Sequence, residues 1–225
     1  MKKIFTLASF AIIFFAACKK TDTPADANIR LVNLSPNSNN QDLNANNALV
    51  IGGVAYSVAS SYRPIASNSP LVTITTAGVA TPFLSANLLL QPSKYYSLFS
   101  YDSTTAFKVS LVEDDRTAPA TGKINMRFFN FYKGSVAVDI KRGTTNLFTS
   151  RTTNDHSANG SYTQYSSMDP GSYSLGVFVA GSSVNLFQLP AIDFVAGKNY
   201  TLVLRGFSSV SSGPQAMVLV PITDN

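Results

Sequence analysis

Cysteine, histidine and tryptophan are almost missing from this chain. Its 225 residues include one cysteine, one histidine and no tryptophan. A single cysteine cannot form a disulfide within the chain, and one cysteine with one histidine excludes zinc sites built from several such ligands. We therefore expect a fold held by its hydrophobic core, with no cofactor and no structural metal.

Charged residues are also scarce, at 13% of the chain. The formal net charge of +5 includes Lys2, Lys3, Lys19 and Lys20, so only about +1 belongs to the rest of the chain. The remaining cations stand singly among Ser, Thr and Asn, whereas a nucleic-acid binder needs a basic patch or stripe. We therefore expect no nucleic-acid partner.

The N-terminal segment has the pattern of an export signal. Two lysines precede an apolar run over residues 4–15, which is too short to span a bilayer of about 30 Å. Phe15-Ala16-Ala17-Cys18 resembles a lipobox with Phe15 in the usual place of Leu. This resemblance implies that residues 1–17 are a cleaved signal peptide, that Cys18 is lipidated, and that residues 18–26 tether the protein to a membrane. We expect the outer membrane of a Gram-negative bacterium, with the periplasmic or surface face left open.

Beyond the leader, the pattern is that of strands and turns. Short alternating runs of Val, Ile, Leu, Phe, Tyr and Thr are separated by Gly, Pro or Asn-rich breaks, and no window of a dozen residues sustains a helical period. The sequence therefore predicts an all-β protein.

The mature sequence contains a repeat of about one hundred residues. Its matched residues are Arg30 with Arg127, Asn33 with Asn130, Asp42 with Asp139, Tyr62 with Tyr162, and Lys94–Leu98 with Lys198–Leu202. The spacing between partners widens along the chain, so the second copy is expected to have longer loops and the same order of strands.

Each copy has about seven strand-like runs, one of them over 161–166 in the second copy. Seven short strands in about a hundred residues are typical of an immunoglobulin-like sandwich. We therefore predict two tandem immunoglobulin-like β-sandwich domains after the cleaved signal. Their expected bounds are 27–113 and 123–225, with a linker over 114–122.

Two tyrosines fit a known turn at the start of a strand. Phe194–Tyr200 reads apolar, two residues, Gly, two residues, Tyr, and Leu90–Tyr96 repeats this with Ser for Gly. The pattern resembles the corner in which a tyrosine hydroxyl bonds nearby backbone, and an ordinary turn is the alternative. Tyr96 and Tyr200 are the candidate corner residues.

The repeated polar residues are expected to be structural. Side-chain alternation places Asn130 with the apolar face of its strand and puts Arg127 and Asp139 on the opposite faces of theirs. We therefore expect Asn33 and Asn130 to be buried with backbone partners. Arg30 should pair with Asp42, and Arg127 with Asp139, across exposed sheet surfaces.

The chain resembles a known family at this point. An arginine strand ending in Asn and Ser-Pro (residues 30–36), an Asp-led strand at Asp42 and an acidic, Pro-containing linker into Gly-Lys (residues 114–123) are similar to an uncharacterised β-sandwich family of bacterial cell-envelope lipoproteins. The second copy departs from the pattern, because Phe131-Tyr132-Lys133 replaces Ser-Pro. Members of that family are domains of unknown function, so the resemblance implies a fold and no activity.

Little else in the sequence indicates chemistry. Asp155-His156-Ser157 lies in a polar loop that we expect to face water, and catalytic triads assemble from distant segments, so no catalytic residue is assigned. Glu113-Asp114-Asp115 could collect calcium but lacks the spacing of a calcium loop, and a solvated linker is the simpler interpretation.

Three functions therefore stay open. The first is a non-catalytic, lipid-anchored envelope protein that acts in protein binding, assembly or display. The second is a glycan-binding surface module, which would present two or more coplanar exposed tyrosines. The third is an envelope enzyme with an unrecognised site. The expected partners are the membrane, through the lipid, and an envelope protein or a glycan.

Overall fold

The computed structural model describes residues 24–134 and 136–224, so Cys18 and the leader lie outside the described residues. The described chain is built of β-strands with two short 3₁₀ helices, η1 (Asp155–Ser157) and η2 (Gly160–Thr163). Within this part of the chain, no helix has the length and apolar character needed to cross a membrane.

The first half of the chain forms two sheets. We call inner the sheet in the order β4-β1-β8-β9, in which β5 also pairs with β1; its strands are β4 (Val58–Ala59), β1 (Ala27–Asn33), β8 (Tyr95–Tyr101), β9 (Lys108–Glu113) and β5 (Arg63–Ile65). The outer sheet consists of β3 (Ala48–Val54), β2 (Gln41–Ala45), β6 (Leu71–Thr76) and β7 (Pro82–Asn87). Their facing sides enclose a core that includes Ile29, Leu43, Ile74 and Leu98.

The second half repeats this arrangement. Its inner sheet consists of β13 (Ser166–Met168), β10 (Ile124–Asn130), β16 (Asn199–Arg205) and β17 (Val218–Thr223). Its outer sheet consists of β12 (Thr145–Arg151), β11 (Val138–Arg142), β14 (Gly171–Val179) and β15 (Asn185–Phe194). Corresponding strands pair alike, since β1 runs parallel to β8 and β10 runs parallel to β16. The prediction of an all-β protein built of sandwiches is confirmed.

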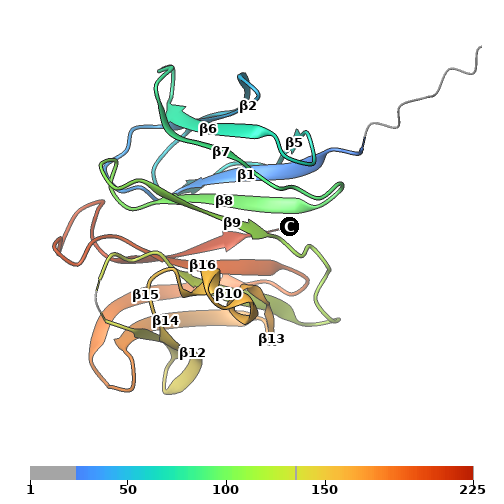
Figure 1. Cartoon of the computed structure of the whole chain (residues 1–225). Coiled ribbons are helices and arrows are strands. Elements are labelled where there is room, and N and C mark those ends of the chain that lie inside the picture. The colour runs from blue at the N-terminus through green and yellow to red at the C-terminus, as the bar shows by residue number, and fades with distance from the viewer. Residues whose placement is uncertain (1–23, 135, 225) are drawn as a thin grey trace, which may run out of the picture.

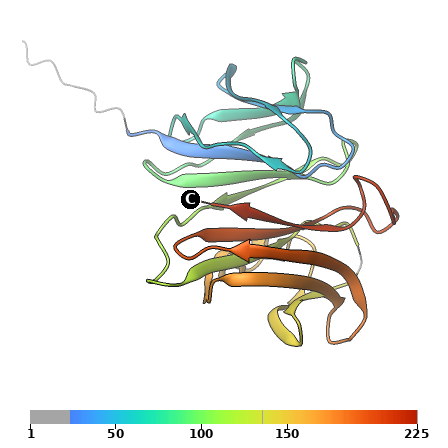
Figure 2. The ribbon, with the colours of Figure 1, turned by 180° about the vertical axis from the view of Figure 1, so that it is seen from behind.

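The two sandwiches are stacked inner sheet to inner sheet, which gives four layers (Figures 1 and 2). An apolar cluster that includes Val32, Phe99, Phe129, Phe131 and Val203 fills the junction between the halves. The ring centres of Phe99 and Phe129 lie 5.5 Å apart, one edge against the other's face. Both faces of β1, β8, β10 and β16 are therefore buried, and the halves form one body.

One predicted strand is wrong. Residues 160–163 form η2 instead of opening a strand, because the Asn159 side chain caps this turn by accepting from the backbone N–H of Ser161. The neighbouring strand β13 begins only at Ser166.

Candidate functional site

The repeated arginines lie in the junction between the halves, and their predicted partners are wrong. Arg30 and Arg127 are 3% and 1% exposed. Arg30 forms an ion pair with Asp224, and Arg127 forms one with Asp114. Side-chain alternation did place both arginines on the face away from their own core, but that face meets the other sandwich instead of water.

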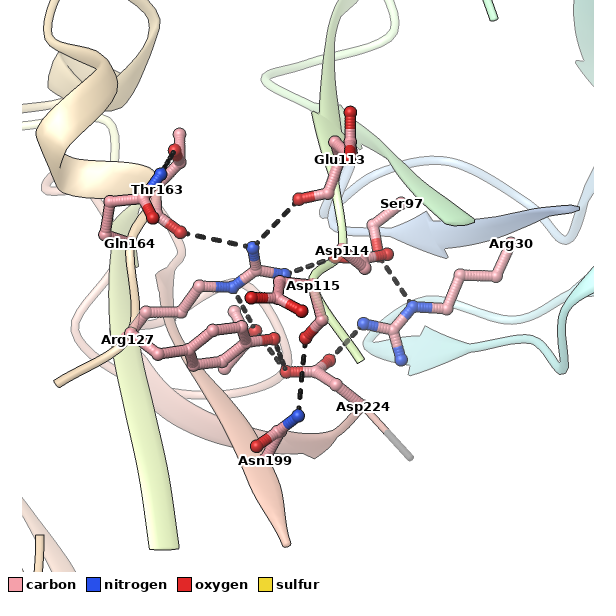
Figure 3. A network of polar contacts seen from close by, with 12 residues as sticks. Arg30, Ser97, Glu113, Asp114, Asp115, Arg127, Thr163, Gln164, Asn199 and Asp224 are labelled. Atoms are coloured by element: carbon pink, nitrogen blue, oxygen red, sulfur yellow. Dashed lines mark hydrogen bonds and ion pairs between the residues drawn. The ribbon is translucent and has the colours of Figure 1, made fainter. Parts of the chain in front are cut away.

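The arginine of each half thus pairs with the aspartate at the end of the other half, which gives a pseudo-twofold network (Figure 3). Asp114 accepts from the Ser97 hydroxyl at 2.6 Å and from the Tyr62 hydroxyl at 2.8 Å, both from the first half. Its other carboxylate oxygen receives Arg127 from the second half.

The second half repeats these contacts with its own residues. Asp224 accepts from Thr201 at 2.6 Å and from Tyr165 at 2.8 Å, while its other oxygen receives Arg30. Each arginine also donates to the backbone carbonyl that precedes its aspartate, at Thr223 and at Glu113. The tyrosine that corresponds to Tyr62 is therefore Tyr165, and the predicted match with Tyr162 is wrong.

The network keeps its arginines charged and its tyrosine hydroxyls protonated. Burial acts to lower the pKa of Arg30, but the carboxylates of Asp224 and Asp114 more than offset this and raise it above its usual value. Burial, together with the adjacent carboxylate, raises the pKa of the Tyr62 and Tyr165 hydroxyls. Two carboxylates balance the charge of the two arginines. Because each ion pair runs from one half to the other, the network joins the halves.

Asp42 and Asp139 set the strand register and do not bind the arginines. Asp42 accepts from the backbone N–H groups of Gly53 at 2.7 Å and Gly78 at 3.0 Å. Gly53 lies where the pairing of β2 with β3 shifts, at φ 70°.

Asp139 has the corresponding role in the second half. It accepts from the N–H groups of Ser150 at 2.8 Å and Gly181 at 3.0 Å, and Ser150 lies where the pairing of β11 with β12 shifts. Each aspartate therefore holds a bulge and a neighbouring turn in place.

The prediction for the repeated asparagines is confirmed. Asn33 and Asn130 are fully buried. The Asn33 amide donates to the Val54 carbonyl at 3.0 Å, and the Asn130 amide donates to the Arg151 carbonyl at 3.1 Å. Both side chains thus satisfy backbone groups at the ends of their strands, as an inward-facing amide must.

The tyrosine corners are also confirmed. The Tyr96 hydroxyl accepts from the Gln91 N–H at 3.0 Å, and the Tyr200 hydroxyl accepts from the Val195 N–H at 2.9 Å. In each half, this contact fixes the turn that leads into the strand beside the arginine strand.

His156 does not face water, so the predicted loop position is wrong. The side chain is buried in the junction, its ring centre 4.5 Å from that of Phe129, and Nε2 lies 2.9 Å from the Ser110 hydroxyl of the first half. Its Nδ1 has no hydrogen-bond partner, and burial lowers the pKa of the ring to about 4.

The neighbouring acid does not complete a triad with His156. Asp155 is held by Arg151, with Nε to Oδ2 at 2.8 Å. The η1 turn therefore carries the imidazole towards Phe129 and leaves it without an orienting carboxylate.

The linker acids do not converge on an ion. Glu113 pairs with Lys94, Asp114 is used in the network, and Asp115 accepts from the backbone N–H of Thr117. Over residues 24–134 and 136–224, no three acidic, histidine or cysteine side chains are grouped to hold a metal.

The aromatic platform expected of a glycan-binding module is not formed by Tyr62 and Tyr95. Their ring centres are 5.2 Å apart, but the rings are nearly perpendicular, at 89°. Both are part-buried beneath Arg116, whose guanidinium lies over each ring.

Loops of both halves that are rich in Ser, Asn, Gly and Thr gather at one end of the strands. We call this the loop end; it comprises residues 34–40, 77–81, 102–107, 131–134, 180–184 and 206–217. Across the junction, the Asp102 carboxylate accepts from Lys133, and within the first half the Asp102 carbonyl accepts from the Ser35 hydroxyl. The chain enters β1 at the opposite end (Figure 1).

The two ends differ in charge. Within the loops of the loop end, only Asp102 and Lys133 are charged, and they pair with each other; Lys108, the first residue of β9, also lies 3.5 Å from Asp102. The opposite end carries many charged side chains, among them Arg63, Lys94, Arg116, Lys123, Asp169 and Lys198. Ser, Asn, Gly and Thr dominate the loop end, a composition that gives adaptable hydrogen bonding to a binding surface.

Sequence reasoning missed several members of the network: Tyr62, Ser97, Tyr165, Thr201 and Asp224. The signal for Ser97 and Thr201 was available, because they occupy matching places in the repeat. The signal for Asp224 was weaker, because nothing near it resembles the acidic linker around Asp114.

Comparison with known proteins identifies a family. No curated protein matches the chain. A model of a domain of unknown function, DUF4397, matches residues 27–141, which is the first sandwich together with β10 and most of β11. The chain therefore belongs to the DUF4397 family.

Proposed function

We propose that this protein is a non-catalytic, lipid-anchored protein of the cell envelope that binds a partner protein through its loop end. The observation that carries this proposal is the segregation of the surface. Ser- and Asn-rich loops with few charged residues, from both sandwiches, meet at one end, and the loops rich in charge lie at the end where the chain enters β1.

The lipid attachment rests on the leader pattern and Cys18. A tether over residues 18–26 would reach at most about 30 Å when extended. With the tether at the charged end, the loop end would point away from the bilayer. The junction between the halves would then hold the loops of both sandwiches in a fixed relation, as a recognition surface requires.

The anchor can be tested by cell fractionation. Cys18→Ala should move the protein out of the membrane fraction, because the lipid attachment site is lost. Mass spectrometry that finds an unmodified Cys18 in membrane-fraction protein would contradict the anchor.

The binding surface can be tested by site-specific photo-crosslinking in cells. A photoreactive residue at exposed positions Asn39 and Ser209 of the loop end should give the same discrete crosslinked species. The matched control is Ala196, which is exposed at the opposite end. Equal yields of this species from Ala196, or no crosslinked species from the loop end, would overturn the proposal.

A further inference from the structure

The pseudo-twofold relation between the halves breaks at the loop end of the junction. Arg205, the last residue of β16, reaches from the second half to the first. Its Nε donates to the Ser57 hydroxyl at 2.9 Å, and its guanidinium lies 4.4 Å from the centre of the Tyr56 ring. Its Nη1 also donates to the Pro214 carbonyl at 2.8 Å. The Arg205 side chain therefore occupies this part of the junction, and hydrogen bonds hold it there.

Tyr101 occupies the matching place at the end of β8, but it does not repeat these contacts. Its ring packs on Phe131, with centres 4.8 Å apart. The residues that correspond to Tyr56 and Ser57 are Thr153 and Asn154, since the N–H groups of Ser57 and Asn154 bond the carbonyls of the two repeated asparagines. A hollow of about 410 Å³ lies between Tyr101, Phe131, Thr153 and Asn154.

Asn154, which lines the hollow, has a side-chain acceptor without a donor. The Oδ1 atom of Asn154 is buried and has no hydrogen-bond partner, whereas its Nδ2 donates to the Ser157 hydroxyl at 2.9 Å. An unsatisfied buried acceptor costs about 1–3 kcal/mol. At the matching place in the first half, the Ser57 hydroxyl has Arg205 as its donor. Asn154 Oδ1 therefore lacks an N–H donor like the one that Arg205 supplies to Ser57.

The rim of the hollow carries a surplus of positive charge. Asp102 is 8% exposed, and its carboxylate oxygens lie 2.7 Å from the Lys133 ammonium and 3.5 Å from the Lys108 ammonium. Two cations thus share one anion, which favours an incoming carboxylate and disfavours a guanidinium. Both lysine side chains are more than half exposed, so they can move to admit a ligand to the buried acceptor.

We propose that this hollow binds the carboxyl terminus of a partner polypeptide. The terminal carboxylate meets Lys133 and Lys108, and the last peptide N–H donates to Asn154 Oδ1. An apolar terminal side chain packs against Tyr101 and Phe131 where they line the hollow. The inference deepens the proposed function and rests on it, because it gives the loop end a specific ligand chemistry.

The test uses two small probes with the full-length protein. N-acetyl-L-phenylalanine has an amide N–H, an aromatic side chain and a free carboxylate. N-acetyl-L-phenylalaninamide, called the amide below, differs only in that an uncharged carboxamide replaces the carboxylate. In NMR titrations, the acid should shift the backbone signals of Gly134, Thr153 and Asn154, and it should bind at least fivefold more tightly than the amide. Equal effects of the two probes, or no shifts up to millimolar concentrations, would overturn the proposal.

Variants locate the binding. Lys133→Gln should weaken binding of the acid at least fivefold, whereas Lys198→Gln, an exposed lysine at the opposite end, should not. Tyr101→Arg places in the hollow the side chain that fills the other side of the junction, and it should abolish binding. Unchanged binding by Lys133→Gln would overturn the site, even if Tyr101→Arg failed to fold. Position-specific crosslinks at the loop end without binding of the acid would refute this inference and leave the proposed function standing.

Discussion

The two ends of the junction between the halves differ in how closely their contacts follow the pseudo-twofold relation. At the end where the chain enters β1, the ion-pair network is made twice, with an arginine, a hydroxyl, a tyrosine and an aspartate from each half. At the loop end, Arg205 in the second half corresponds to Tyr101 in the first, and the contacts differ. The residues of the ion-pair network match between the copies, while the contacts at the loop end have diverged.

The strongest test of the matched end removes a carboxylate from each side. Asp114→Asn and Asp224→Asn should each lower the free energy of unfolding by about 3–5 kcal/mol, because a buried arginine loses its counter-charge. Urea unfolding would measure both, with Asp115→Asn as the control, since Asp115 is the exposed neighbour of Asp114. A large effect at one aspartate and a small effect at the other would break the pseudo-twofold description.

His156 offers a test of a contact made on one side only. Its pKa is about 4 in the fold against 6.5 for an ordinary histidine, so the neutral ring is favoured by folding. Its contribution is fully present above pH 6.5 and is lost as the pH falls towards 4, by up to about 3 kcal/mol. Urea unfolding at pH 7 and pH 4.5 should therefore show a smaller loss of stability for His156→Gln than for the wild type. Equal losses would mean that the ring is not desolvated in the junction.

The tyrosine corners should give the smallest and most equal pair of effects. Tyr96→Phe and Tyr200→Phe each remove a hydroxyl that accepts one backbone N–H, so each should cost about 1 kcal/mol in the free energy of unfolding. Thermal or urea unfolding would compare them. A difference of more than about 1 kcal/mol would show that the two corners are not equivalent.

The repeat allowed much of each half to be predicted from the sequence. It placed the inward asparagines and both tyrosine corners, because these depend on contacts within one sandwich. The network was mispredicted because it depends on how two sandwiches pack. A signal for this packing was present in Arg127-Phe128-Phe129-Asn130-Phe131, where apolar residues occupy both faces of the strand. Near-continuous apolar strands are typical of sheets covered on both sides.

His156 could not be placed from the sequence for a related reason. It lies between Asn154 and Tyr165, a connection that is longer than the corresponding one between Ser57 and Tyr62 in the first half. The first half has the short strand β4 there, whereas the second half has η1 and η2. An insertion in a surface connection is ordinarily read as solvated, and only the neighbouring sandwich buries it.

The exchange of charges also bears on the order in which the protein can complete its folding. A chain that is synthesised from its N-terminus forms the first sandwich while Arg30 still lacks Asp224, and the apolar face around Phe99 is uncovered until β10 and β16 fold. Folding is therefore complete only when Asp224, which follows the last strand, pairs with Arg30 on the first strand. Until then the nascent chain exposes an apolar surface that is prone to aggregate.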